Sequence, residues 1–305
     1  LYMMGTYSQR SEEALNNIVE SVKKAKEEAQ PLTIVGGGTK DFLFKERIGS
    51  QIPLSKLSGI VNYEPTELVV TALAGTTLKE LECLLKTGNQ MLGFEPPRFG
   101  EDSTIGGVIS SGFSGPARPY KGALRDHLLG VALINGKGEN LRFGGQVIKN
   151  VAGYDISRLA AGSFGTLGIL TEVSLRVFPI PERTVTMIWE LEKSESIKHL
   201  QKISKSSWPI TANTVFEGKL FVRLAGGPGL IRDAIRSLSP DAVEEKPSLW
   251  DPIRDLITQR SLRKPSSILW RVSVPPATSL DQLEGELIEW GGAQRWLVSE
   301  SNDRT

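Results

Sequence analysis

The sequence predicts an α+β protein built from two domains. Its 305 residues suffice for two ordinary domains, each with a hydrophobic core. Glycine-rich segments lie mainly in the first half, whereas all six tryptophans lie in the second, and Pro179 and Pro181 separate the two. We therefore expect a larger N-terminal domain over residues 1–181 and a smaller C-terminal domain over residues 182–305.

The first half opens with the pattern of a helix followed by a strand. Apolar residues recur at helical spacing between Ala14 and Ala25, and Pro31 ends that segment. The apolar run over residues 32–35 is predicted to be a buried strand that leads directly into the glycines at 36–38.

A second strand is predicted over residues 68–75. Thr77 and Glu80 then form a capping box for a helix that ends near Gly88. Residues 93–115 are rich in glycine and serine and are predicted to be a long loop.

The rest of the first half predicts three further elements. The turn at residues 135–138 favours a β-hairpin, because asparagine and glycine tolerate positive φ. Residues 155–161 are predicted to be a short helix. Apolar and polar residues alternate from 172 to 177, which is typical of a half-buried strand.

The second half predicts a small α+β sandwich with its helices on one face of a sheet. Strands are expected at residues 184–192, 213–226 and 268–274. Helices are expected at residues 196–204, 230–238 and 280–290.

Charge and cysteine content exclude several classes of function. Lysine and arginine total 36 against 35 acidic residues, and a net charge of +1 does not favour a nucleic-acid partner. Cys83 is the only cysteine, so the chain cannot supply an internal disulfide or a cysteine-ligated iron–sulfur cluster. No apolar run approaches the length of a membrane helix, and the N-terminus lacks the pattern of a secretory signal. We expect a cytoplasmic protein.

Common catalytic motifs are also missing. The dinucleotide pattern G-x-G-x-x-G fails because Asp41 occupies its third position. There is no P-loop and no G-x-S-x-G elbow. His127 and His199 are the only histidines, which disfavours both a Ser-His pair and a multi-histidine metal site.

The two glycine-rich segments favour binding of a diphosphate. Glycines let main-chain N–H groups approach a ligand closely, so such loops can cradle phosphates without many positive side chains. Ser103 and Thr104 have hydroxyls that can donate to a diphosphate, and Lys40 and Arg98 have charges that can neutralise it. The alternative is that the two cations are ordinary surface residues.

Several segments resemble the flavoproteins of the vanillyl-alcohol oxidase type, whose PCMH-type domain binds FAD between two α+β subdomains. The resemblance runs from Pro31 to about Pro181, with one further segment, WGGAQRWL, near the end. Within this family, EPTELVVTALAGT, FEPPRFG and LRFGGQVIKNVAGYDISRLAAGS resemble the FAD-binding E subunits of bacterial glycolate oxidases. Since relatives continue well past WGGAQRWL, we expect the C-terminal domain to lack its end.

The resemblance implies a set of FAD-binding residues in four segments. The first diphosphate loop corresponds to Gly36, Gly37, Gly38, Thr39, Lys40 and Asp41. The second corresponds to Pro97, Gly100, Asp102, Ser103, Thr104, Gly106 and Gly107. The turn under the flavin corresponds to Ser111, Gly112, Phe113 and Ser114, and the backbone facing the cofactor to Gly165, Thr166, Leu167, Gly168 and Ile169. Lys149 is our candidate for tuning the flavin.

The sequence departs from catalytic members of the family at two places. Those members carry a histidine-rich metal cluster in the C-terminal half, where this chain has only His199, and they have glutamate where this chain has Phe164. No catalytic base can be named and no metal is expected. The first loop lacks the histidine that tethers flavin in some relatives, so the FAD should be non-covalent.

These features imply an FAD-binding subunit of a complex that oxidises glycolate, a small 2-hydroxy acid, to glyoxylate. Its flavin is expected to relay electrons beside two partners, a sister FAD-binding catalytic subunit and an iron–sulfur subunit. Any contact with the inner membrane is expected to be peripheral and through these partners. Two alternatives remain open: a self-sufficient FAD-dependent 2-hydroxy-acid dehydrogenase, and a structural subunit with a degenerate cofactor site.

Overall fold

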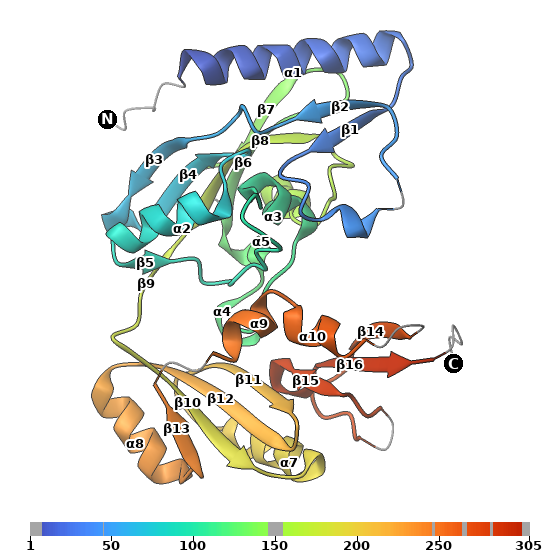
Figure 1. Cartoon of the computed structure of the whole chain (residues 1–305). Coiled ribbons are helices and arrows are strands. Elements are labelled where there is room, and N and C mark those ends of the chain that lie inside the picture. Colours follow the sequence, from blue (N-terminus) through green and yellow to red (C-terminus); the bar gives the residue numbers. More distant parts are fainter. Residues whose placement is uncertain are drawn as a thin grey trace. The chain divides into compact units, whose positions relative to one another are not determined.

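The computed structural model describes residues 8–44, 46–145, 155–245, 248–263, 267–280 and 283–300. Helices and strands are mixed along the chain, which confirms the predicted α+β class (Figure 1). The chain forms two compact units. The first consists of Leu1–Phe113 and Ala123–Ile180, and the second of Ser114–Gly122 and Pro181–Thr305. We did not expect the segment 114–122 to group with the second unit.

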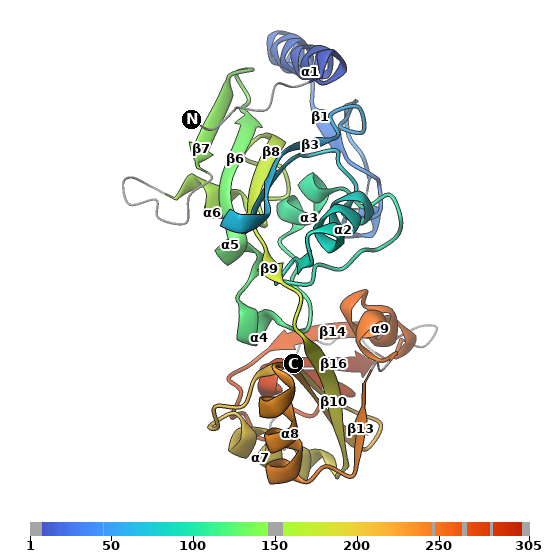
Figure 2. The same cartoon turned by 90° about the vertical axis from the view of Figure 1, so that its left-hand side faces the viewer.

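The first unit is built around a five-stranded antiparallel sheet. Its strands, in spatial order, are β3 (Ile60–Glu64), β4 (Val69–Leu73), β8 (Ile169–Arg176), β6 (Leu128–Ile134) and β7 (Asn140–Gly144). Helices α2 (Leu78–Thr87) and α3 (Ile105–Ser111) cover one face of this sheet (Figure 2). A separate parallel pair joins β1 (Leu32–Val35) to β2 (Ser50–Pro53). Smaller elements are η1 (Asp41–Leu43), η2 (Pro65–Glu67), β5 (Gln90–Met91), α5 (Leu124–His127), α6 (Ile156–Ala160) and β9 (Phe178–Pro179).

The helices at the start of the first unit follow the sequence signals. Helix α1 (Gln9–Glu27) buries a stripe that includes Ile18 and Val22, as its periodicity predicts. In α2, the Thr77 hydroxyl accepts a hydrogen bond from the Glu80 amide at 3.1 Å, and the helix ends before Gly88. The predicted hairpin is also present, since β6 pairs with β7.

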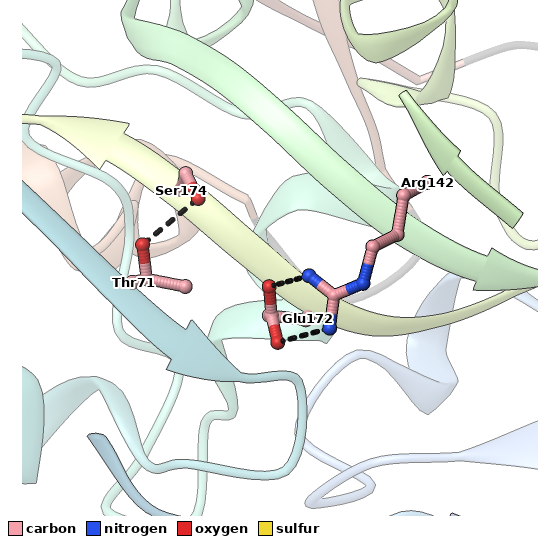
Figure 3. A network of polar contacts seen from close by, with 4 residues as sticks. All are labelled: Thr71, Arg142, Glu172 and Ser174. Atoms are coloured by element: carbon pink, nitrogen blue, oxygen red, sulfur yellow. Dashed lines mark hydrogen bonds and ion pairs between the residues drawn. The ribbon is translucent and has the colours of Figure 1, made fainter. Parts of the chain in front are cut away.

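Strand β8 was predicted to be half-buried, and this was wrong. Seven of its eight residues are buried, because it lies in the centre of the sheet between β4 and β6. Two of its polar residues have partners on the neighbouring strands (Figure 3): Ser174 shares a hydrogen bond of 2.9 Å with Thr71, and Arg142 donates to both carboxylate oxygens of Glu172 at 2.5 and 3.0 Å. Burial therefore does not leave these groups unsatisfied.

The prediction of a continuous loop over residues 93–115 was also wrong, because α3 lies inside it. The Thr104 hydroxyl caps this helix by accepting from the Gly107 amide at 3.3 Å, and Gly112, with φ of +68°, ends it. Two glycines in the helix cost helical propensity, but Gly106 permits close packing: a Cβ there would lie 2.7 Å from the Ala74 Cβ.

The second unit contains a seven-stranded antiparallel sheet. Its strands, in spatial order, are β13 (Ala242–Glu244), β10 (Arg183–Glu190), β12 (Lys219–Gly226), β11 (Ile210–Phe216), β15 (Leu287–Glu289), β16 (Gln294–Ser299) and β14 (Ile268–Ser273). The helical elements of this unit are α4 (Arg118–Lys121), α7 (Lys193–Ile203), α8 (Pro228–Leu238), α9 (Trp250–Arg254), α10 (Ile257–Ser261) and η3 (Trp290–Gly292).

Two expectations for the second unit were wrong. Helices occur on both faces of its sheet: α7 and α8 pack on one face, whereas Trp250 of α9 packs on the other and donates to the Thr186 hydroxyl at 2.8 Å (Figure 2). The helix predicted over residues 280–290 is not formed by residues 283–289, which the structure describes, and Leu287–Glu289 instead forms β15 between β11 and β16. No helix within the described residues is long and apolar enough to cross a bilayer.

Candidate functional site

A pocket lies within the first unit, with a volume of about 760 Å³ when the open solvent at its mouth is included. Its lining comes from the end of β1 and the following loop, from the start of β8 and from α3. The lining residues are Ile34, Val35, Gly36, Gly37, Gly38, Thr39, Lys40, Asp41, Leu43, Phe44, Leu54, Thr104, Gly106, Gly107, Ser110, Ser111, Phe164, Gly165, Gly168 and Leu170.

The loop after β1 presents a row of available amides to this pocket. The backbone N–H groups of residues 36–40 donate to no acceptor among the described residues. Gly38 adopts the left-handed conformation, with φ of +70°, which turns the chain between these amides. Consecutive amides that point into a cavity form an anion-binding nest, so this loop is suited to hold phosphate oxygens.

The first glycine loop lies against the second. A Cβ on Gly37 would lie far inside 3.0 Å of the Asp102 carbonyl oxygen, and a Cβ on Gly36 would lie 2.5 Å from the Thr104 hydroxyl. At Gly37 the first loop touches the backbone of the second, which leaves no room for a side chain, and at Gly36 it touches the Thr104 side chain. This contact fixes one wall of the pocket.

The amides at the start of α3 are already bonded. Ile105 donates to the Thr76 carbonyl and Gly106 to the Ala74 carbonyl, both at 2.8 Å, while Gly107 donates to the Thr104 hydroxyl. Gly106 and Gly107 line the pocket, yet they supply no spare donors. In this they differ from residues 36–40, whose amides are available to a ligand.

Lys40 is the only basic side chain among the lining residues that the structure describes. Its ammonium lies 3.0 Å from the Ser103 hydroxyl and 5.6 Å from the centre of the Phe99 ring. Burial lowers the pKa of Lys40 to about 8. Asp41 is the only acidic residue of the lining, and it is exposed and ion-paired with Arg47.

Two aromatic residues stand at the edge of the pocket. Phe164 has φ of +51°, and its amide donates to the Ser110 carbonyl at 2.9 Å. Its ring makes an edge-to-face contact with the Phe44 ring, with the two centroids 6.4 Å apart, and both rings are about half exposed. Phe164 thus lines the pocket without offering a charged group.

Twelve of the predicted binding residues lie in the lining: Gly36, Gly37, Gly38, Thr39, Lys40, Asp41, Thr104, Gly106, Gly107, Ser111, Gly165 and Gly168. The predicted residues outside the lining are Pro97, Gly100, Asp102, Ser103, Gly112, Phe113, Ser114, Thr166, Leu167 and Ile169. Ser114 belongs to the second unit, and Lys149 lies outside the described residues.

Sequence reasoning missed eight lining residues: Ile34, Val35, Leu43, Phe44, Leu54, Ser110, Phe164 and Leu170. Most are apolar and read as core positions. Leu54 enters the lining because its amide bonds to the Val35 carbonyl at 2.8 Å, next to the parallel pair of β1 and β2. No local signal in the sequence indicates this long-range pairing.

Comparison with known proteins agrees with this geometry. Residues 10–144 match the FAD binding domain family. The chain is 40% identical over 287 residues to glycolate oxidase subunit GlcE of Escherichia coli (strain K12), covering 94% of this chain and 81% of that protein. The chain belongs to the GlcE family of PCMH-type FAD-binding proteins. The predicted family, fold and cofactor, FAD, are thereby confirmed.

More distant relatives of this GlcE-family chain match over shorter regions. D-lactate dehydrogenase of Anaerostipes hadrus is 31% identical over 148 residues, covering 48% of this chain and 30% of that enzyme. The solved structure of an alkyldihydroxyacetonephosphate synthase superposes with a TM-score of 0.66 at 18% identity, covering 85% of this chain and 60% of the other. This last likeness shows the shared fold.

Proposed function

We propose that this chain is the FAD-binding subunit of a complex that oxidises glycolate to glyoxylate, and that its flavin relays electrons to a partner. The observation that carries the proposal is the row of available amides at residues 36–40, which line the pocket of the first unit. The 40% identity to a glycolate oxidase subunit supports the choice of complex.

The residues present fit FAD held without a covalent bond. The amides of residues 36–40 and the ammonium of Lys40 would bind the diphosphate. The loop contains no histidine that could form a tether to the flavin ring. When bound, FAD supplies the capacity to accept and pass on electrons, which protein side chains lack.

A relay role is supported by the shortage of acid–base groups at the pocket. Oxidation of a 2-hydroxy acid requires a base to take the hydroxyl proton, and such a base works best when it titrates near neutral pH. The described lining residues include no histidine, and the one carboxylate among them is paired with Arg47. Within the described residues, no group of three or more His, Cys, Asp and Glu is placed to hold a metal ion.

The proposed partners are a sister FAD-binding catalytic subunit and an iron–sulfur subunit. The relatives named as glycolate oxidase subunits support assembly with other chains, and one of them, GlcD of Bacillus subtilis (strain 168), is 42% identical over 86 residues, covering 28% of this chain and 18% of that protein. Cys83 is the only cysteine of this chain, so a cysteine-ligated cluster must belong to another subunit. We place the complex in the cytoplasm, with any attachment to the inner membrane made through the partners.

A second candidate is a self-sufficient 2-hydroxy-acid dehydrogenase. The 31% identity to a D-lactate dehydrogenase favours it, although that match spans only 30% of the enzyme. A scaffold with a degenerate cofactor site is disfavoured by the intact loop of available amides.

Purification of the chain alone and with its co-expressed partners tests the proposal. We expect the isolated chain to carry non-covalent FAD, visible as a flavin absorption spectrum that is lost from the protein on denaturation. Glycolate should bleach this spectrum only when the partners are present. Bleaching of the isolated chain would show instead a self-sufficient dehydrogenase, and a colourless chain that takes up no added FAD would contradict flavin binding altogether.

A further inference from the structure

The ammonium of Lys40 lies where three parts of the pocket meet. It extends from the first glycine loop to the Ser103 hydroxyl of the second, at 3.0 Å. A Cβ on Gly107 of α3 would lie 3.8 Å from the same nitrogen. The one basic side chain of the lining is therefore held beside the available amides of residues 36–40.

Within the described part of the chain, no carboxylate is ion-paired with this ammonium. Its bonded partners are a hydroxyl and the face of the Phe99 ring. Asp41 is ion-paired with Arg47, and Glu101 is ion-paired with Lys79.

Other charged groups near Lys40 are few. The loop that carries Ser103 also holds Arg98 and the exposed Asp102. Neither α3 nor the segment 163–170 contains a titratable side chain. Desolvation of this partly buried cation, which has no carboxylate partner among the described residues, is costly, and this cost falls when an anionic ligand binds.

We propose that Lys40 recognises the negative charge of the diphosphate of FAD, and that it binds this diphosphate only in its protonated form. Binding of FAD in mildly alkaline solution is then accompanied by the uptake of a proton. This inference rests on the proposed binding of FAD. According to this inference, Lys40 causes the pocket to prefer a diphosphate over a monophosphate. The affinity of the chain for FAD then depends on pH.

The sign of the pH effect follows from the ligand-free protein. Burial lowers the pKa of Lys40 to about 8. Below that pH the amine is already protonated before FAD binds, so binding takes up only a small fraction of a proton. Above it the amine is mostly neutral, and a bound diphosphate raises its pKa again by favouring the charged form. Affinity is then constant below about pH 7 and falls by up to about tenfold per pH unit above about pH 8.

Calorimetry of the flavin-free chain tests the proton uptake without any mutation. FAD is titrated at pH 6.5 and pH 8.5, each in two buffers of different ionisation enthalpy. We expect uptake near zero at the lower pH and more than about half a proton at the higher pH. ADP, which has the diphosphate without the flavin, should show the same difference, whereas FMN, which has only a monophosphate, should bind weakly at both pH values.

Three variants separate charge from structure. Lys40→Met should weaken FAD binding by about 10- to 100-fold at pH 7 and remove the pH dependence. Lys40→Arg keeps a permanent charge, so it should restore most of the affinity and bind equally well at pH 7 and pH 9. Lys86→Met, at an exposed position of α2, is the matched control and should behave as the unmodified chain.

The outcomes distinguish this inference from the proposed function. If FAD binds with no proton uptake at pH 8.5, or if Lys40→Met binds it as tightly as the Lys86→Met control, the inference is wrong while FAD binding stands. If neither the unmodified chain nor Lys40→Arg binds FAD at any pH, the proposed function itself is wrong.

Discussion

Gly37→Ala is expected to abolish FAD binding and to destabilise the first unit. The added Cβ would collide with the Asp102 carbonyl oxygen, a backbone atom that cannot rotate away. The second loop is itself anchored, since the Leu78 amide donates to the Ser103 carbonyl at 2.6 Å. Relief therefore requires the two loops to separate. We expect a loss of about 1–3 kcal/mol in the free energy of unfolding, measured by urea titration, and a protein without flavin absorption.

Gly136→Ala is the matched control for this prediction. Gly136 lies in the turn between β6 and β7, and a Cβ there would meet no atom within 4 Å. We expect a change in the free energy of unfolding within about 0.5 kcal/mol and normal flavin content. Equal behaviour of the two alanine variants would show that the loops do not depend on the close approach at Gly37.

Arg142→Met is expected to cause the second large loss of stability. The Glu172 carboxylate is almost fully buried in the central strand β8, and Arg142 donates to both of its oxygens (Figure 3). Removing the guanidinium takes away a bidentate ion pair from this buried charge. Because Arg142 itself is about half exposed, water can replace part of the interaction, so we expect a loss of about 2 kcal/mol in the free energy of unfolding.

Two further variants show whether the buried carboxylate is the cause. Arg158→Met removes an arginine whose partner, Asp155, is exposed, so its cost should stay below about 1 kcal/mol. The double variant Arg142→Met with Glu172→Met removes the buried charge as well and should recover much of the stability lost by Arg142→Met. A similar cost for Arg142→Met and Arg158→Met would contradict this account of Glu172.

Local signals in the sequence predicted the elements whose ends are fixed by neighbouring residues. The hydroxyl of Thr77 bonds within one turn of its own helix, and the turn at residues 135–138 closes a hairpin between adjacent segments. Such interactions span only a few residues, so composition and spacing reveal them. The stripe of α1 is equally local, because its period alone determines which residues face inward.

The errors arose where distant segments decide the structure. Glu172 and Ser174 look like a solvent-facing row until Arg142 and Thr71 approach them across neighbouring strands. Residues 287–289 have helical spacing around them, yet pairing with β11 and β16 overrides that local preference.

In the candidate site, too, the residues marked by local sequence signals were predicted and those placed by long-range contacts were missed. Its glycines were visible in the sequence, since few other residues form such loops. Phe44 and Leu54 were not, because they reach the pocket through long-range packing.

The grouping of Ser114–Gly122 with the second unit has a consequence for dissecting the protein. The polypeptide passes between the units three times, after residues 113, 122 and 180. A fragment beginning at Pro181 would lack Tyr120, which bonds to the buried Asn213, and Arg118, which lies over the Trp290 ring at 4.6 Å. The C-terminal half is thus not expected to fold as an isolated fragment. It would need the nine residues Ser114–Gly122, either added as a separate peptide or joined to it by circular permutation.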